Sequence, residues 1–149
     1  MGHLTIAFFV AGTPKPQGSK RAFMRPNAKH PTMVESAGDA LKDWRAAVSY
    51  TAAKQDARID GPVRVSLTFR FPRPQSHFGT GSNAETLKKS APEFHIQRPD
   101  VDKLTRAVLD ALTNITFGDD SCVVAQSARK EWAGKGFRAG CFIEVEPII

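Results

Sequence analysis

The feature that most constrains the fold is a strict alternation over residues 63–71, VRVSLTFRF, where apolar and polar side chains take turns. Successive side chains of a β-strand point to opposite faces, so this segment predicts a strand with one apolar face. That face must be covered for the chain to fold, and 149 residues are enough to build such a core without disulfides or structural metals. The sequence therefore has to supply partner strands and covering helices.

Both are predicted from similar patterns. Alternation or short apolar runs predict strands, and apolar positions at helical spacing predict helices, the first of them capped by Ser36. The predicted elements, in chain order, are residues 4–10, 36–52, 63–71, 101–112, 123–132 and 137–145. This order predicts an α+β fold in one small domain, residues 1–149, with a mixed β-sheet and helices packed on one face.

A long connection separates the central strand from the second helix. Residues 72–99 contain four Pro and two Gly. Connections of this length in a compact domain are usually functional or mobile, so we expect a mobile substrate loop here.

The chain is basic, with 21 Lys and Arg against 15 Asp and Glu, and residues 15–29 hold five cations and no acid. Such a segment indicates either a solvated surface loop or a site that binds phosphates. No apolar run reaches the ~20 residues that a membrane span needs. The first residues resemble a strand rather than a signal peptide, and Cys122 and Cys141 form no disulfide or zinc pattern, so we expect a reduced, cytoplasmic protein.

Acidic residues gather in one stretch of this basic chain. Pro99 leads into Asp100 at the expected N-cap of the second helix, and Asp102 lies in its first turn, so both carboxylates can point to the same side. Asp119 and Asp120 come after the helix and a turn. They return to the helix start only if the next strand runs suitably beside the earlier one.

Two interpretations of these acids stay open at this point. Acids at a helix N-terminus complement the dipole, and Asp-Asp is common in turns, so the cluster is explicable as capping alone. Alternatively, oxygen ligands without a His or Cys cluster suit Mg²⁺, or Mn²⁺, as used in metal-assisted cleavage of phosphodiesters.

At these positions the chain resembles the RusA-type crossover-junction endodeoxyribonucleases, or Holliday junction resolvases. The resemblance lies in DVDKLTRAVLDAL (100–112), GDDSCVV (118–124) and Lys130, and extends to VAGTPKPQGSK (10–20) and the helix bearing Trp44. It implies a RusA-like fold and a homodimer that cuts four-way DNA junctions by paired incisions, with Mg²⁺ and no organic cofactor. Many such proteins are encoded by phages or prophages.

The resemblance also assigns site residues. The essential acids, and the metal ligands, fall on Asp100, Asp102 and Asp120. The family's active-site lysine is replaced by Arg106, whose planar guanidinium does not readily give up a proton, so Lys103 or Lys130 are alternative cations. We expect DNA-binding cations to hold the backbone without reading bases. They are Lys15, Lys20, Arg21, Arg25, Lys103 and Lys130, with Lys88 and Lys89 in the long connection.

Other residues favour structural interpretations. Asp110 is expected to form an i,i+4 ion pair with Arg106, and Asp119 to be a turn residue or a partner of the metal ligands. His77 and His95 lack ligand spacing. We expect Trp44 and Trp132 to lie in the core or an interface.

Two functional alternatives remain beside the junction resolvase. One is a DNA-binding module without catalysis, in which the acids are only caps. The other is a metal-dependent nuclease that acts on flaps or duplexes. The restriction-enzyme pattern, an Asp followed by Glu-x-Lys, is absent after Asp100.

Overall fold

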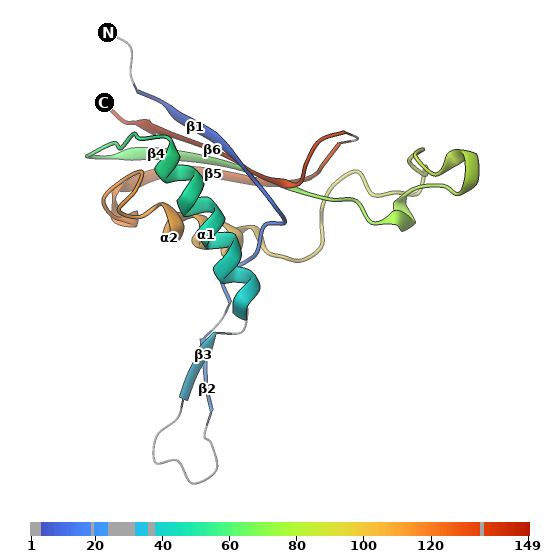
Figure 1. The fold of residues 1–149 in the computed structure, drawn as a ribbon, viewed down its shortest axis with the longest axis horizontal. Coiled ribbons are helices and arrows are strands. Elements are labelled where there is room, and N and C mark those ends of the chain that lie inside the picture. The colour runs from blue at the N-terminus through green and yellow to red at the C-terminus, as the bar shows by residue number, and fades with distance from the viewer. Residues whose placement is uncertain (1–3, 19, 24–31, 36–37, 135) are drawn as a thin grey trace.

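The computed structural model describes residues 4–18, 20–23, 32–35, 38–134 and 136–149. Its centre is a four-stranded sheet (Figure 1) in the order β1-β6-β4-β5. The strands are β1 (Ile6–Ala11), β4 (Val63–Phe71), β5 (Val123–Trp132) and β6 (Gly140–Pro147). β6 pairs antiparallel with β1 and β4, whereas β4 and β5 are parallel. The predicted mixed sheet is confirmed.

Both long helices lie on the same side of this sheet (Figure 1) and pack against each other. They are α1 (Gly38–Lys54) and α2 (Val101–Leu112). The apolar face of α1 contributes Leu41, Trp44 and Val48 to the core. The burial of Trp44 confirms its prediction as a core residue, and the predicted α+β fold with helices on one face is confirmed.

The alternation in β4 determines how the core is filled. All five apolar residues of this strand are buried, and the residues between them are more exposed. The helices cover the buried face, so β4 is central and its apolar side chains fill the space between sheet and helices. The buried residues of this strand are Val63, Val65, Leu67, Phe69 and Phe71.

The order β4, α2, β5 forms a crossover unit, because β4 and β5 are parallel. In such a unit the helix connects the two strands and runs antiparallel to them on one face of the sheet. α2 therefore begins at the end of the sheet where β4 finishes, and it finishes at the opposite end, where β5 begins. Figure 1 shows the long connection of residues 72–99, in green and yellow, at one end of the sheet and the orange segment between α2 and β5 at the other.

The basic segment contains structure that the sequence pattern did not predict. β2 (Lys20–Phe23) and β3 (Thr32–Glu35) form a separate two-stranded antiparallel sheet. Each strand has only four residues, which is too short for a periodic pattern to be recognised among Gly, Pro and Lys. The predicted cap Ser36 lies outside the described residues.

The long connection folds back on itself at its outer end. It contains two short 3₁₀ turns, Gln75–His77 and Gly81–Asn83. Phe78 and Leu87 form an antiparallel bridge, and the Lys88 N–H donates to the His77 carbonyl at 2.9 Å. The mobility predicted for this connection stays a prediction.

Both cysteines are free thiols, as expected. Cys141 is fully buried, and burial raises the pKa of its thiol far above the ordinary value. No helix in the described part of the chain combines the length and apolarity that crossing a membrane requires.

Candidate active site

The predicted acids at the start of α2 occupy the expected positions. Asp100 is the N-cap, with extended backbone (φ −72°, ψ 140°), and its carbonyl accepts the Leu104 N–H at 3.1 Å. Its carboxylate makes no capping hydrogen bond, although N-cap Asp residues ordinarily use their carboxylate for this purpose. Asp102 lies in the first turn with its side chain 66% exposed. The carboxylate of Asp100 is therefore not needed to cap the helix.

Arg106 lies beside Asp102. Its Nη2 is 3.9 Å from Asp102 Oδ2, one turn apart on α2. The sequence had predicted that Arg106 pairs with Asp110, and this is wrong. Side chains of an α-helix lean toward its N-terminus, so Arg106 extends toward the preceding turn rather than the following one. The site therefore combines a carboxylate pair with a guanidinium at one end of α2.

Asp119 and Asp120 belong to a 3₁₀ turn, Asp120–Cys122, that leads into β5. The Ser121 N–H donates to Asp119 Oδ2 at 3.0 Å, and hydrogen bonding from Ser121 lowers the pKa of the Asp119 carboxyl. Asp119 is thus a turn residue, one of its two predicted roles. Asp120, the next residue, is exposed.

The topology separates Asp120 from the other two acids within one chain. Asp100 lies where α2 begins, near the C-terminal ends of β4 and β5. Asp120 lies where β5 begins, at the opposite end of the sheet. β5 does run beside β4, but it runs parallel, so its start faces away from the start of α2. Across the described residues, no three His, Cys, Asp or Glu side chains are close enough to hold one metal ion.

Lys130 contacts the segment that leads into α2. It is half-buried on β5, and its Nζ donates to the carbonyl of Gln97 at 2.6 Å and to that of Pro99 at 2.9 Å. These contacts lie directly before Asp100. The sequence carried no signal for them, because a backbone carbonyl acceptor is present whatever the residue type.

The first basic loop also reaches α2. The Gln17 N–H donates to the Lys103 carbonyl at 3.0 Å, which brings the segment containing Lys15 beside the first turn of the helix. For Lys20 and Arg21 the structure describes only the backbone, in β2, and Arg25 lies outside the described residues.

An aromatic cluster holds the base of the long connection. His95 is buried, with its ring 4.5 Å from that of Phe71 and 4.4 Å from that of Trp132. Burial, and then the charge of Lys130, lowers the pKa of His95. Arg73 lies over the Trp132 ring at 5.3 Å and donates to the Pro92 carbonyl at 2.7 Å. Trp132 is confirmed as a buried residue, and His95 takes part in packing.

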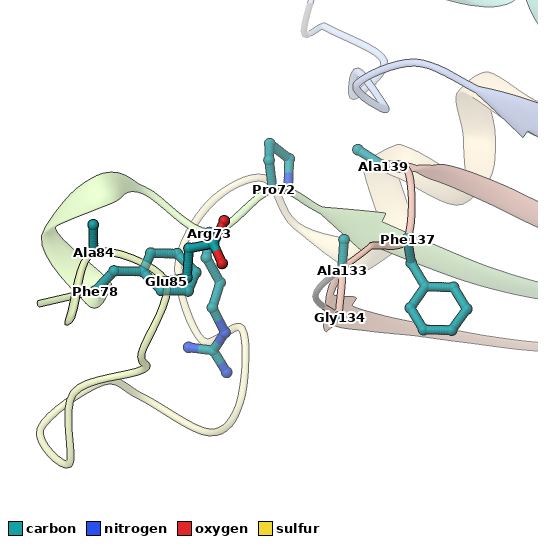
Figure 2. Close-up of a pocket in the computed structure, with 9 residues that line it drawn as sticks. All are labelled: Pro72, Arg73, Phe78, Ala84, Glu85, Ala133, Gly134, Phe137 and Ala139. Carbon is teal, nitrogen blue, oxygen red and sulfur yellow. The ribbon is translucent and has the colours of Figure 1, made fainter. Parts of the chain in front are cut away.

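A pocket of about 290 Å³ lies beyond this cluster (Figure 2). Arg73, Phe78 and Glu85 line it from the long connection, and Ala133 and Phe137 from the segment between β5 and β6. None of the predicted acids lines it, so this pocket is separate from the candidate active site.

The acids at the start of α2 have the chemistry that a hard divalent cation requires. Mg²⁺ binds oxygen ligands and is normally held by one or two carboxylates plus substrate phosphate. Asp100 and Asp102 supply oxygens only, and the Asp100 carboxylate is free of a capping bond. The pair fits a Mg²⁺ or Mn²⁺ site that is completed from outside this chain, by substrate or by a second copy.

Comparison with known proteins agrees with these observations. The family model described as Endodeoxyribonuclease RusA matches residues 12–146. The chain is also 30% identical over 122 residues to "Uncharacterized protein YqaN" of Bacillus subtilis (strain 168). That alignment covers 80% of this chain and 82% of the relative.

Proposed function

Since this chain belongs to the RusA endodeoxyribonuclease family, we propose that it is a Mg²⁺-dependent nuclease that resolves four-way DNA junctions by paired incisions. The family implies nuclease activity, and RusA nucleases generally depend on a divalent metal. The observation that carries the proposal for this chain is the pair at the start of α2. Asp100 occupies the N-cap without using its carboxylate to cap, and Asp102 follows with an exposed carboxylate.

We propose that the site is completed between two copies of the chain. Asp100 and Asp102 of one copy would act with Asp120 of the other. The reason is that the crossover unit keeps Asp120 at the end of the sheet opposite to Asp100 within one chain. A two-fold dimer repeats each contact, so it would contain two such sites. Two equivalent sites match the paired strands that a junction resolvase has to cut.

In this proposal the acids hold the cation and Arg106 provides positive charge beside them. A bound Mg²⁺ supplies an activated water and neutralises charge that develops on the scissile phosphate. The guanidinium of Arg106, 3.9 Å from Asp102, is exposed and so is accessible to a phosphate oxygen. Arg makes bidentate contacts to phosphate but is a poor proton donor, so its role is to stabilise charge.

Cations outside the metal site would hold the DNA backbone. Lys103 follows Asp102 on α2, and the hydrogen bond from Gln17 to its carbonyl brings the loop of Lys15 to the same region. Lys20, Arg21 and Arg25 continue this basic segment. Such contacts raise affinity without sequence readout and make binding depend on salt. A cytoplasmic setting and a phage or prophage origin belong to the same proposal.

The test is cleavage of a synthetic four-way junction by the purified protein. We expect cleavage in Mg²⁺, none with chelator, and a loss of at least ~100-fold in Asp100→Asn, because one metal ligand is removed. Asp110→Asn is the matched control, since it removes the same charge from the same helix. Equal rates for wild type and Asp100→Asn would contradict the proposed site.

The alternatives give different results in the same experiment. A non-catalytic binding module binds the junction but does not cut it in Mg²⁺. A flap or duplex nuclease cuts flap or linear DNA at least as fast as the junction. All substrates are compared at one salt concentration, because salt alone changes affinity by orders of magnitude.

A further inference from the structure

The ammonium of Lys130 makes a long-range contact beside the candidate site. Its Nζ donates to two carbonyls of the chain immediately before α2, those of Gln97 and Pro99. The contact to Gln97, at 2.6 Å, is short for a hydrogen bond between nitrogen and oxygen, and the contact to Pro99, at 2.9 Å, has the ordinary length.

The second of these carbonyls fixes the backbone of Asp100. The peptide bond is planar, so the Pro99 carbonyl and the Asp100 N–H belong to one rigid unit. On its other side, the Asp100 carbonyl accepts the Leu104 N–H within the helix. The backbone of Asp100 is therefore held from both directions, by Lys130 and by α2. Its carboxylate, which lacks a capping bond, depends on this backbone for its position.

Neighbouring contacts hold the last part of the long connection, residues 92–99, against the C-terminal ends of β4 and β5. The His95 ring contacts those of Phe71 and Trp132, at 4.5 and 4.4 Å between ring centres. Arg73 holds the Pro92 carbonyl. Arg73, at the start of the long connection, and Lys130, on β5, thus bind carbonyls at three points of its returning part, and the contact of Lys130 with Pro99 is the last before Asp100.

We propose that Lys130 is a positioning residue, which orients the Asp100 carboxylate for metal binding and does not contact the DNA backbone. The inference rests on the proposed function and adds to it a role that differs from the phosphate contact expected from sequence. An ammonium has three donors, and two of those of Lys130 are already used. Only one donor is left for any other partner, so a phosphate contact would compete with the orientation that the two carbonyls impose on the ammonium.

The experiment compares Lys130→Met with Arg129→Met. Arg129 precedes Lys130 on the same strand, its side chain is 73% exposed, and it pairs with Glu131. Its variant therefore removes the same charge from the neighbouring position and leaves the two contacts of Lys130 in place. For each protein we would measure kcat, KM, junction affinity in chelator at several salt concentrations, and amide hydrogen exchange of residues 97–104.

For Lys130→Met we expect a fall of about 10- to 100-fold in kcat, as for other residues that orient metal ligands, with KM and junction affinity within about two-fold of wild type. Amide exchange at residues 97–104 should accelerate. Lys130→Arg, which can still donate to two carbonyls, should recover part of kcat. Arg129→Met should retain wild-type kcat and exchange.

Two outcomes would overturn the inference. Weaker junction binding by Lys130→Met with a shallower salt dependence, and unchanged kcat at saturation, would make Lys130 a phosphate contact. Unchanged exchange at residues 97–104 would show that Lys130 does not hold the segment. Failure of the proposed function is distinguishable, because then wild type and Arg129→Met also fail to cleave, and the exchange comparison alone decides the positioning role.

Discussion

Mixing two inactive variants tests whether the metal site is built from two copies of the chain. The variants are Asp100→Asn and Asp120→Asn, each inactive alone if both residues are ligands. In a mixed dimer, a site shared between copies pairs the intact Asp100 of one with the intact Asp120 of the other. A site contained within one chain stays broken in both copies.

The lengths of β5 and α2 indicate how far Asp120 lies from Asp100 and Asp102 within one chain. At ~3.3 Å per residue, β5 covers about 23 Å between Val123, just after Asp120, and Lys130, which contacts the residue before Asp100. Over α2, the ten steps from Asp102 to Leu112 cover about 15 Å at 1.5 Å each. Oxygens on one Mg²⁺ lie within about 4 Å of each other, because each is ~2 Å from the ion. Each of these spans is several times larger than that, so we expect that one chain does not bring Asp120 to an ion held by its own Asp100 and Asp102.

The assay mixes the two proteins in equal amounts, allows subunits to exchange, and follows cleavage of a labelled four-way junction. Random exchange makes half of the dimers mixed, each with one intact site, so about a quarter of the wild-type number of sites should return. The product should be nicked on one strand, since a mixed dimer cannot make paired incisions. Mixing Asp100→Asn with Asp102→Asn is the control, because both variants damage the same half of the site.

Activity that stays at the background of the single variants, with subunit exchange verified by native mass spectrometry of tagged copies, would refute the reasoning. Equal recovery in the control mixture would refute it as well. In both cases Asp120 would not be a ligand supplied by a partner.

Three further predictions concern stability and binding. Gly140→Ala should lower the free energy of unfolding by about 1–3 kcal/mol in urea titrations, because a Cβ there would collide with the Val10 carbonyl and the Phe9 ring; an unchanged urea midpoint would contradict this. The lowered pKa of His95 means that the unfolded chain binds more protons near and below the ordinary value of 6.5, so stability should decline as pH falls through that value. His95→Phe should reduce this decline in unfolding free energies measured between pH 5 and about 7.5, and an identical pH dependence would exclude His95 as its source. Lys103→Gln should weaken junction binding in chelator and reduce the slope of log K against log salt by about 0.9, whereas an unchanged slope would remove it from the backbone contacts.

The sequence predicted what depends on local periodicity. The alternation in residues 63–71 and the helical spacing from Val101 to Leu112 are properties of short segments, and the structure reproduces both. The direction of β5 was not predictable, because strand pairing joins residues about 60 positions apart. That direction decides whether Asp120 can reach Asp100 within one chain, so the residue types of the site were accessible from sequence and their grouping was not.

Two details of the site show the same limit at smaller scale. Spacing led to the prediction that Arg106 pairs with Asp110, but Asp102 lies equally four residues away, and the lean of helical side chains toward the N-terminus favours Asp102. Lys130 was predicted to bind DNA or to replace the family's active-site lysine. Its partners in the structure are main-chain carbonyls, which every sequence possesses. The short strands β2 and β3 were missed because four residues carry little periodic signal.

The arrangement of the long connection has a consequence for how proteins of this kind diversify. Its outer part, from Phe78 to Leu87, closes on itself, while separate contacts from Arg73 and Lys130 secure the portion near the sheet. Lengthening a loop whose ends are already fixed adds little entropic cost. The tip is therefore free to accept insertions and new side chains over evolutionary time without disturbing the carboxylates that follow.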